Sequence, residues 1–182
     1  MSDQYSKVTQ IQGRLWVLRD PDGALYDDID TDMIFHNRYL HITDVDEMGQ
    51  YALDNLKGWE DFAKKAQPGD IVMAGKNFGA GSSRQQAVDC FRALGLGAVI
   101  AESFGAIYKR NAINSGLPIV ILPDLTEVQA AFENGDTLQV NFESGEVILE
   151  DDRVFQAQPF SQVQMDIYQA GNLFAYGKSL ED

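Results

Sequence analysis

The chain has 182 residues, of which 45% are hydrophobic and 23% are charged. These are the proportions of a globular protein with a packed core and a length of about one domain, and they exclude an intrinsically disordered chain. Acidic residues outnumber basic ones by 28 to 14, and the net charge of −14 argues against sequence-independent binding to nucleic-acid phosphates. Cys90 is the only cysteine, so this chain alone cannot complete a disulfide framework or a cysteine-based zinc or iron–sulfur site.

The first residues, MSDQYSKVTQIQG, contain no apolar signal core, and no run of 18 apolar residues occurs in the sequence. We therefore expect neither secretion nor a membrane span. A single cysteine fits a reducing cytoplasm better than an extracellular setting. No internal repeat, low-complexity tract or proline-rich linker is visible, so residues 1–182 are predicted to form one domain.

The first stretch, residues 7–56, mixes strand-like and helix-like patterns. Apolar residues near its start suggest short strands: Val8, Ile11, Leu15 and Val17. A polar segment follows at residues 27–43. Beyond it, three apolar residues at helical spacing predict a helix over residues 44–56: Met48, Ala52 and Leu56.

The middle stretch alternates strand-like and helix-like runs in a βαβαβ pattern. We predict strands at residues 70–74, 98–101 and 117–122, and helices at residues 83–94 and 106–114. The strand runs are almost entirely apolar, as expected of strands buried on both faces of a parallel sheet. The first helix should end at Gly95.

Ligands in parallel sheets of this kind bind beyond the carboxyl ends of the strands. In this chain those ends are residues 75–84, 102–110 and 123–124, so we look for function there.

The last stretch alternates apolar and polar residues around Ser144-Gly145, which predicts an antiparallel hairpin. A final helix-like segment, residues 161–177, is expected to pack three apolar side chains on the domain: Val163, Ile167 and Leu173. The predicted fold class is α/β, with a central parallel βαβαβ unit and flanking antiparallel strands.

The strongest local motif is the glycine-rich run GKNFGAGSSRQQ, residues 75–86, between a predicted strand and a predicted helix. Three glycines allow positive φ angles and close approach of a ligand: Gly75, Gly79 and Gly81. Ser82 or Ser83 would cap the helix, whose free N–H groups and dipole favour an anion. Arg84 could then bind a carboxylate or phosphate with two hydrogen bonds. An ordinary serine cap beside a solvated arginine is the alternative.

The known phosphate-binding motifs do not match this run. It lacks the lysine of the Walker phosphate-binding motif, and its glycine spacing differs from the dinucleotide-binding pattern. A hydrolase nucleophile elbow is excluded too, because neither Ser82 nor Ser83 has glycine two residues away on both sides.

Three aspartates alternate as if along one face of a strand: Asp28, Asp30 and Asp32. A calcium loop is disfavoured, because Met33 and Tyr39 stand where an EF-hand needs glycine and glutamate. His36 and His41 follow, but two histidines in a polar loop are weak evidence for a metal. We predict no metal ligand in this chain.

Two further features are predicted to be structural. Cys90 falls within the first predicted helix of the middle stretch, where we expect a small core residue. The acidic run at residues 150–152 is expected to be a solvated turn.

Three runs, in chain order and followed by the predicted hairpin, resemble a known family: DDIDTDMIFHNRYLHIT, GDIVMAGKNFGAGSSRQQA and AVIAESFGAIYKRNAINSGLPIVI. They are similar to the small subunits of 3-isopropylmalate dehydratase and homoaconitase, which are equivalent to the swivelling domain of aconitase. The similarity covers nearly the whole chain, and NFG-x-GSSR combined with RNAIN-x-GLP is far more specific than a single glycine motif. The resemblance implies a single swivelling β/β/α domain.

The same resemblance implies a partner. In the family, a large subunit holds a 4Fe-4S cluster on three cysteines, and the small subunit binds no cofactor itself. Together, as a heterodimer or heterotetramer, they remove and re-add water on hydroxy-dicarboxylates or hydroxy-tricarboxylates. The iron would act as a Lewis acid on the leaving hydroxyl while a base takes a C–H proton.

The resemblance also assigns roles to residues. Ser82 would be the base, as an alkoxide stabilised by the helix N-terminus, nearby N–H groups and Arg84. Ser83 and Arg84 would hold a substrate carboxylate, and Asp32 would help to order the site. Further substrate-binding residues are expected in the loop that follows: Arg38, His41 and Thr43.

The chain departs from the family pattern at several positions. Homoaconitase-like members typically carry arginine at the position of His41, and isopropylmalate enzymes carry an apolar residue there. Five other positions differ from the usual GCGSSREHA and SFARI runs: Ala80, Gln85, Gln86, Gly105 and Ala106.

The leading hypothesis is that the chain is the small subunit of a hydro-lyase, and the favoured substrate is isopropylmalate. A homoaconitase-like or alkylmalate substrate, such as dimethylmalate, stays open. A non-catalytic carboxylate-binding or regulatory module is the alternative from another class, and a stand-alone serine hydrolase is a distant third.

Overall fold

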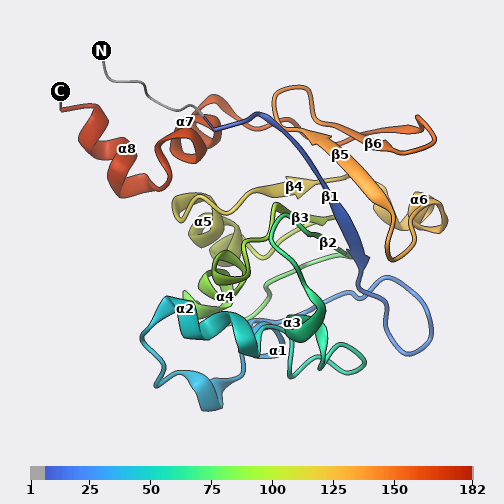
Figure 1. Cartoon of the computed structure of the whole chain (residues 1–182), viewed down its shortest axis with the longest axis horizontal. Helices are drawn as coiled ribbons and strands as arrows, with labels where there is room; N and C mark the ends of the chain where they lie inside the picture. The colour runs from blue at the N-terminus through green and yellow to red at the C-terminus, as the bar shows by residue number, and fades with distance from the viewer. Residues whose placement is uncertain (1–6, 182) are drawn as a thin grey trace.

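The computed structural model describes residues 7–181, and within them the strands form one seven-stranded sheet (Figure 1). The strands are β1 (Gln10–Val17), β2 (Ile71–Ala74), β3 (Ala98–Ala101), β4 (Ile119–Ile121), β5 (Thr137–Asn141), β6 (Glu146–Leu149) and β7 (Val154–Gln156). The helices are α1 (Thr31–Ile34), α2 (Val45–Met48), α3 (Phe62–Lys65), α4 (Gln86–Leu94), α5 (Ala106–Asn114), α6 (Leu125–Val128), α7 (Gln162–Ala170) and α8 (Leu173–Ser179). Single 3-10 turns are η1 (Asn37–Tyr39), η2 (Gly49–Tyr51) and η3 (Gln129–Ala131).

Strand β1 joins a parallel half of the sheet to an antiparallel half. The strand order is β4-β3-β2-β1-β5-β6-β7. β1 pairs in parallel with β2, where Leu15 lies opposite Ile71, and antiparallel with β5, where Gln10 lies opposite Asn141. The predicted fold class, α/β with a parallel βαβαβ unit and flanking antiparallel strands, is confirmed.

The central strands are buried on both faces. Val72 and Ala74 of β2 pack in the same core as α4 and α5, whereas Ile71 and Met73 enter a second core with the antiparallel strands. Successive side chains of a strand point to opposite faces, so an unbroken apolar run needs cover on both. The predicted βαβαβ unit is therefore confirmed, and α4 ends as expected at Gly95, whose φ is +73°.

The first stretch differs from the prediction in two ways. Its short strands are one strand, β1, and the helix expected over residues 44–56 is reduced to α2 and η2. Leu53 has a φ of +62° and donates its N–H to the Ile34 carbonyl, which turns the chain away from a helix. Met48, Ala52 and Leu56 are nevertheless buried, because the folded-back segment covers α4.

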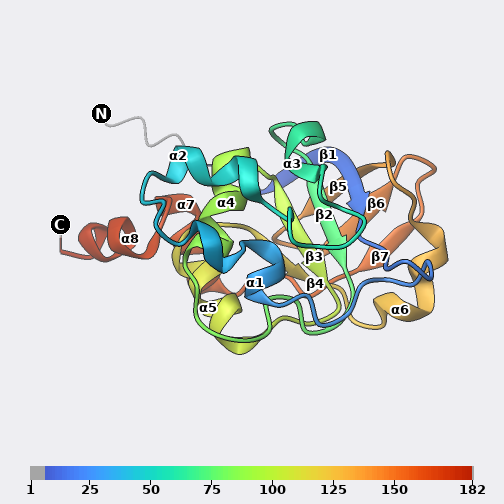
Figure 2. The ribbon, with the colours of Figure 1, turned by 90° about the horizontal axis from the view of Figure 1, so that it is seen from below.

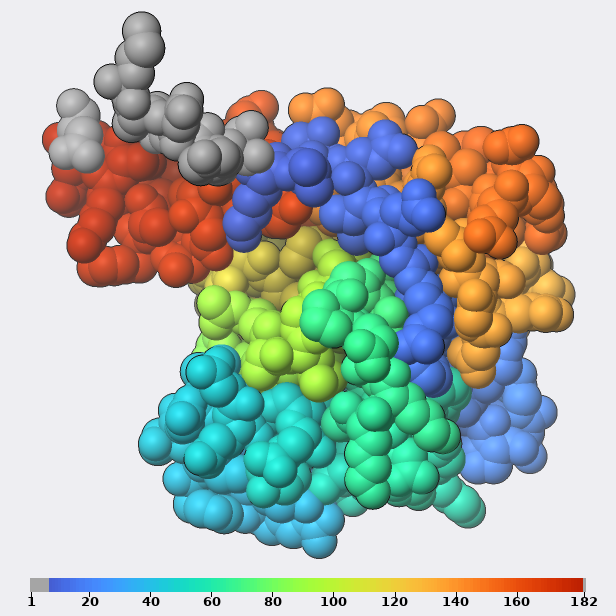
Figure 3. Space-filling model, viewed as in Figure 1, coloured from blue at the N-terminus to red at the C-terminus, as the bar shows by residue number. Residues whose placement is uncertain are grey.

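The C-terminal segment folds back as a hairpin and then as two helices. The hairpin around Ser144-Gly145 is confirmed by antiparallel pairing of β5 with β6. Gly171, with a φ of +102°, separates α7 from α8, and α8 projects from the body of the molecule (Figures 1 and 3). Ile167 is buried as expected, but Val163 and Leu173 are 57% and 44% exposed, so the packing predicted for these two was wrong.

The described helices are short. None of them, within residues 7–181, is long and apolar enough to cross a membrane.

Candidate active site

The glycine-rich loop after β2 lies against two other segments. Gly79 donates its N–H to the Ile29 carbonyl at 2.7 Å, and Thr31 donates its N–H to the Ala80 carbonyl at 3.0 Å. Gly105, after β3, donates to the Phe78 carbonyl at 2.8 Å. Helices α1, α4 and α5 gather on one face of the sheet (Figure 2). The carboxyl ends of β2 and β3 thus meet α1, at the place where the sequence predicts a ligand site.

The three glycines of the loop act differently. Gly79 and Gly81 have φ angles of +80° and +91°, as predicted. Gly75 does not have a positive φ; a Cβ there would lie 2.1 Å from Oδ1 of Asp27, so its role is close packing. At Gly105, where relatives usually carry alanine, a Cβ would lie 2.8 Å from the Gly79 carbonyl oxygen. Glycine at position 105 therefore allows the loop after β3 to pack tightly against the loop after β2.

Of the three glycines of this loop, Gly79 is expected to be the least tolerant of substitution. An added Cβ would lie 2.2 Å from Cγ of Tyr108, whose ring is buried, and the left-handed backbone adds a strain of its own. We expect Gly79→Ala to lower the free energy of unfolding by about 2 to 3 kcal/mol. The matched control is Gly58→Ala, because Gly58 has a φ of +90° with nothing within 4 Å of the added Cβ. Urea titration measures both, and equal losses would show that the Tyr108 contact does not matter.

Neither Ser82 nor Ser83 caps α4, so this prediction was wrong. The N-cap is Gln85, which makes no side-chain capping bond. The loop before α4 is held instead by a contact with α1, in which Oγ1 of Thr31 donates a hydrogen bond to the Ser82 carbonyl at 3.0 Å. Both serine side chains are exposed, and Oγ of Ser83 accepts a hydrogen bond from Nδ2 of Asn111 at 3.2 Å.

Arg84 is held against α1 rather than solvated. Its side chain is only 12% exposed. Its Nη1 donates to the Phe35 carbonyl at 2.7 Å and to Oδ1 of Asp32 at 3.0 Å, with a longer contact of 3.4 Å to the Thr31 carbonyl. All of these bonds use Nη1, and among residues 7–181 no hydrogen bond involves Nη2 or Nε. Nη2 and Nε therefore keep N–H donors that the described residues do not use, and such donors suit an anion.

Asp32 fixes the orientation of Arg84. Desolvation raises the pKa of the Asp32 carboxyl, but hydrogen bonds from Arg84 and from the Asn37 N–H, together with nearby His36, outweigh it and lower the pKa overall. The pair is thus ionised at neutral pH.

The aspartates do not line one face of a strand, contrary to the expectation. Asp28 has a φ of +55°, and Asp30 caps α1 by accepting from the Met33 N–H at 2.8 Å. Over residues 7–181 no group of three or more His, Cys, Asp or Glu side chains could hold a metal ion.

The three predicted residues of the following loop are exposed. Arg38 pairs with Asp54 at 3.5 Å and stacks over the Tyr39 ring, and its side chain is 61% exposed. His41 and Thr43 are exposed. Within the described part of the chain, no hydrogen bond or ion pair joins these three residues to the serines or to Arg84.

Four residues that the sequence did not single out shape this region. Thr31 and Tyr108 support the loop, Asn111 contacts Ser83, and Asp54 accepts from the Tyr39 hydroxyl at 2.5 Å. For Asn111 the clue lay in the RNAIN run, which follows the carboxyl end of the neighbouring strand; nothing in the sequence marked Asp54.

Two departures from the family pattern have visible contacts. Nε2 of Gln85 donates to Oγ of Ser115 at 2.7 Å and to Oδ1 of Asp89 at 3.2 Å, which ties the start of α4 to the end of α5. Ala80 forms a bridge with Asp30. Nothing in the structure explains Gln86 or Ala106.

Cys90 is a core residue, as predicted. It is fully buried in α4, and burial raises the pKa of its thiol. A buried, protonated thiol is a poor metal ligand. The residues of this chain therefore do not fit an iron–sulfur cluster.

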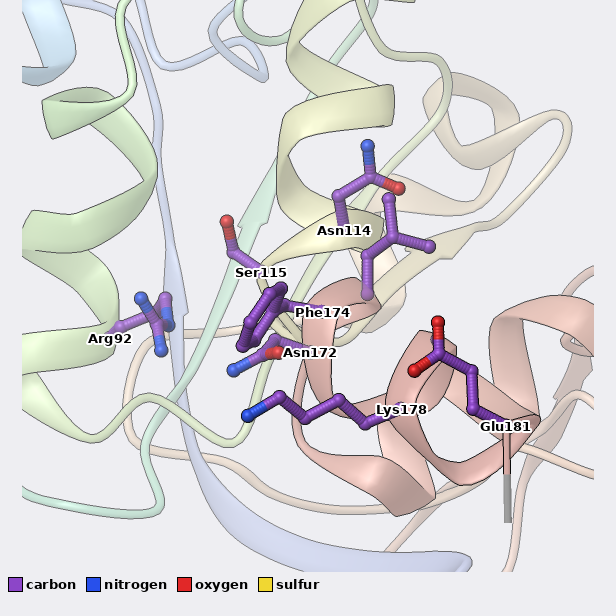
Figure 4. Close-up of a pocket in the computed structure, with 9 residues that line it drawn as sticks. Arg92, Asn114, Ser115, Asn172, Phe174, Lys178 and Glu181 are labelled. Atoms are coloured by element: carbon purple, nitrogen blue, oxygen red, sulfur yellow. The ribbon is translucent and has the colours of Figure 1, made fainter.

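A groove of the described surface lies elsewhere. It has a volume of about 730 Å³ and is lined by Arg92 of α4, Asn114 and Ser115 at the end of α5, and Phe174 and Lys178 of α8, among others (Figure 4). None of the site residues predicted from the sequence lines this groove.

Comparison with known proteins places this geometry in a family. The family described as Aconitase C-terminal domain matches residues 27–124, which include the glycine-rich loop, Asp32 and Arg84. The chain belongs to the aconitase C-terminal domain family.

Similar relatives show to which group within this family the chain belongs. A 3-isopropylmalate dehydratase small subunit from Sulfurisphaera tokodaii is 42% identical over 154 residues, 85% of this chain and 89% of the relative. Small subunit 1 from Methanopyrus kandleri is 39% identical over 90% of this chain and 89% of its own length. A crystal structure of 3-isopropylmalate dehydratase from Methanocaldococcus jannaschii superposes with a TM-score of 0.82 at 33% identity, covering 94% of this chain and 95% of that one. Within the family, the chain groups with the 3-isopropylmalate dehydratase small subunits.

Proposed function

We propose that this chain is the small subunit of a heteromeric hydro-lyase that dehydrates and rehydrates a 2-hydroxy dicarboxylate. The favoured substrate is isopropylmalate, which the enzyme would interconvert between its 2- and 3-hydroxy forms, as in leucine biosynthesis. The observation that carries the proposal is Arg84, which is largely buried, paired with Asp32 through Nη1 alone, and next in sequence to two exposed serines. Such a guanidinium offers a fixed fork to a carboxylate.

Each group has a definite task in this proposal. Ser82 takes the proton from the carbon next to the carboxylate. A free serine is far too weak an acid to be an alkoxide, so the guanidinium of Arg84 and nearby N–H groups must stabilise the oxyanion. Ser83 and Arg84 hold the substrate carboxylate, and Asp32 holds Arg84 in place.

A partner completes the site. The hydroxyl-bearing side chains of Ser82 and Ser83 lie exposed, so this chain by itself does not enclose a substrate. We propose that a large subunit covers them, carries the 4Fe-4S cluster that this chain cannot hold, and binds in the cytoplasm as a heterodimer or heterotetramer. Residues 1–182 would act as one swivelling domain against that partner.

Substrate choice is assigned to the loop with Arg38, His41 and Thr43. Arg38 is tied to Asp54 only at 3.5 Å and is mostly exposed, so it is available to a substrate that binds across the loop. Homoaconitase-like and alkylmalate substrates remain the alternatives.

His41→Arg is expected to shift preference toward a substrate with an additional carboxylate. Arginine places a permanent cation at this position, and we expect the ratio of kcat/KM values to move by about tenfold. The measurement compares an alkylmalate with a tricarboxylate on the complex. An unchanged ratio would show that the loop does not contact that group.

The second candidate, a non-catalytic carboxylate-binding module, is favoured by the same open edge of Arg84. Purification of the chain with its native neighbours distinguishes the two. Co-purification of a cluster-bearing subunit with dehydratase activity supports the hydro-lyase. Absence of such a subunit, together with malate binding that is lost in Arg84→Ala, supports the module.

A further inference from the structure

Helix α5 reaches the candidate active site through one side chain. Nδ2 of Asn111 donates a hydrogen bond to Oγ of Ser83 at 3.2 Å. This bond links the βα unit after β3 to the loop after β2, two segments that are 28 residues apart in the chain. In the described part of the chain, it is the bond that fixes the Ser83 hydroxyl.

The direction of this bond has a chemical consequence. An amide N–H that occupies a lone pair of Oγ leaves the hydroxyl proton of Ser83 free to point elsewhere. A carboxylate accepts hydrogen bonds but donates none. Ser83 is therefore prepared to donate to an anion, as a substrate-binding serine needs.

We propose that Asn111 is a positioning residue, which orients the Ser83 hydroxyl as a donor to a substrate carboxylate. The inference rests on the proposed function. Asn111 acts through the Ser83 hydroxyl and not on the substrate directly, so its replacement affects substrate binding rather than proton transfer.

The rest of α5 supports a fixed position for Asn111. The buried residues of the helix, Tyr108 and Ala112, flank Asn111 in sequence and pack in the core. The hydroxyl of Tyr108 also donates to the Ala87 carbonyl of α4 at 3.0 Å. Rigid elements hold a binding group more accurately than a loop does.

The test is a double-mutant cycle in the reconstituted complex. We expect Asn111→Leu, which has nearly the same shape, to raise KM for 2-isopropylmalate about tenfold with little change in kcat. Asn111→Asp should raise KM further, because it accepts the Ser83 proton and adds a negative charge beside an anion. In a Ser83→Ala background, Asn111→Leu should have no further effect.

The matched control is Asn114→Asp, which adds the same charge on the same helix three residues away and lines the groove near α8 instead. It should leave KM unchanged, and thermal unfolding shows that each variant is folded. Additive effects of Asn111→Leu and Ser83→Ala, or an equal effect of Asn114→Asp, would overturn the inference while an active wild-type complex leaves the proposed function standing. A wild-type complex without turnover overturns both.

Discussion

Replacing Ser82 with alanine is expected to lower kcat of the complex by about 10²- to 10⁴-fold, the range found when a general base is removed. KM should change little, because the role proposed for the lost hydroxyl is proton transfer, and the neighbours proposed to hold the carboxylate remain. The backbone should not move either, since Thr31 binds the carbonyl of Ser82 and not its side chain.

The control for this variant is Ser103→Ala. Ser103 lies in the adjoining loop after β3, and its Oγ accepts the N–H of Asn77 at 2.9 Å, outside the Gly-Ser-Ser-Arg run. It should retain most of the wild-type kcat. Wild-type turnover by the Ser82→Ala complex would remove Ser82 from the role of base.

The second large effect is expected at Arg84. Arg84→Ala removes the group proposed to bind the substrate carboxylate, and truncating one partner of such a charge pair, when it is enclosed in the complex, costs about 2 to 5 kcal/mol. We expect kcat/KM to fall by about 10²- to 10³-fold, mainly through KM. Arg84→Lys should recover only part of this, because an ammonium cannot bind Asp32 and a carboxylate with the two edges of one planar group.

Arg92→Lys is the matched control for Arg84→Lys. Arg92 also pairs with an aspartate at 3.0 Å, Asp89, but it lies at the other end of α4. Its replacement should leave kcat/KM within about twofold of wild type, because lysine keeps the positive charge and the pair lies outside the candidate site. Steady-state kinetics compares kcat/KM for Arg84→Lys and Arg92→Lys. Similar losses in the two variants would mean that Arg84 acts through stability rather than through substrate binding.

The periodicity of the sequence was sufficient for the parallel half of the fold. Strands β2 and β3, and helices α4 and α5, fall close to the predicted ranges because uninterrupted apolar runs and helical spacing are local properties. The position of β1 between β2 and β5 is not local. Its pairing with Asn141 joins residues far apart in the chain, and no pattern within residues 10–17 names that partner.

The candidate site was predicted in its residues but not in its contacts. Ser82 and Ser83 looked like helix caps, because serine before a helix usually is one. The loop instead bends at Ser82, where Thr31, from a distant segment, donates a hydrogen bond to the Ser82 carbonyl. Arg38 was expected to bind substrate, and its ion pair with Asp54 was not foreseen, because a contact between two loops leaves no trace in local sequence.

The central proposal is that this chain contributes the base and the carboxylate-binding groups to an active site that it shares with a cluster-bearing large subunit. The most direct measurement is the initial rate of 2-isopropylmalate dehydration by the large subunit alone, by this chain alone and by the two together. We predict turnover only for the two together. Equal turnover by the large subunit alone would contradict the claim.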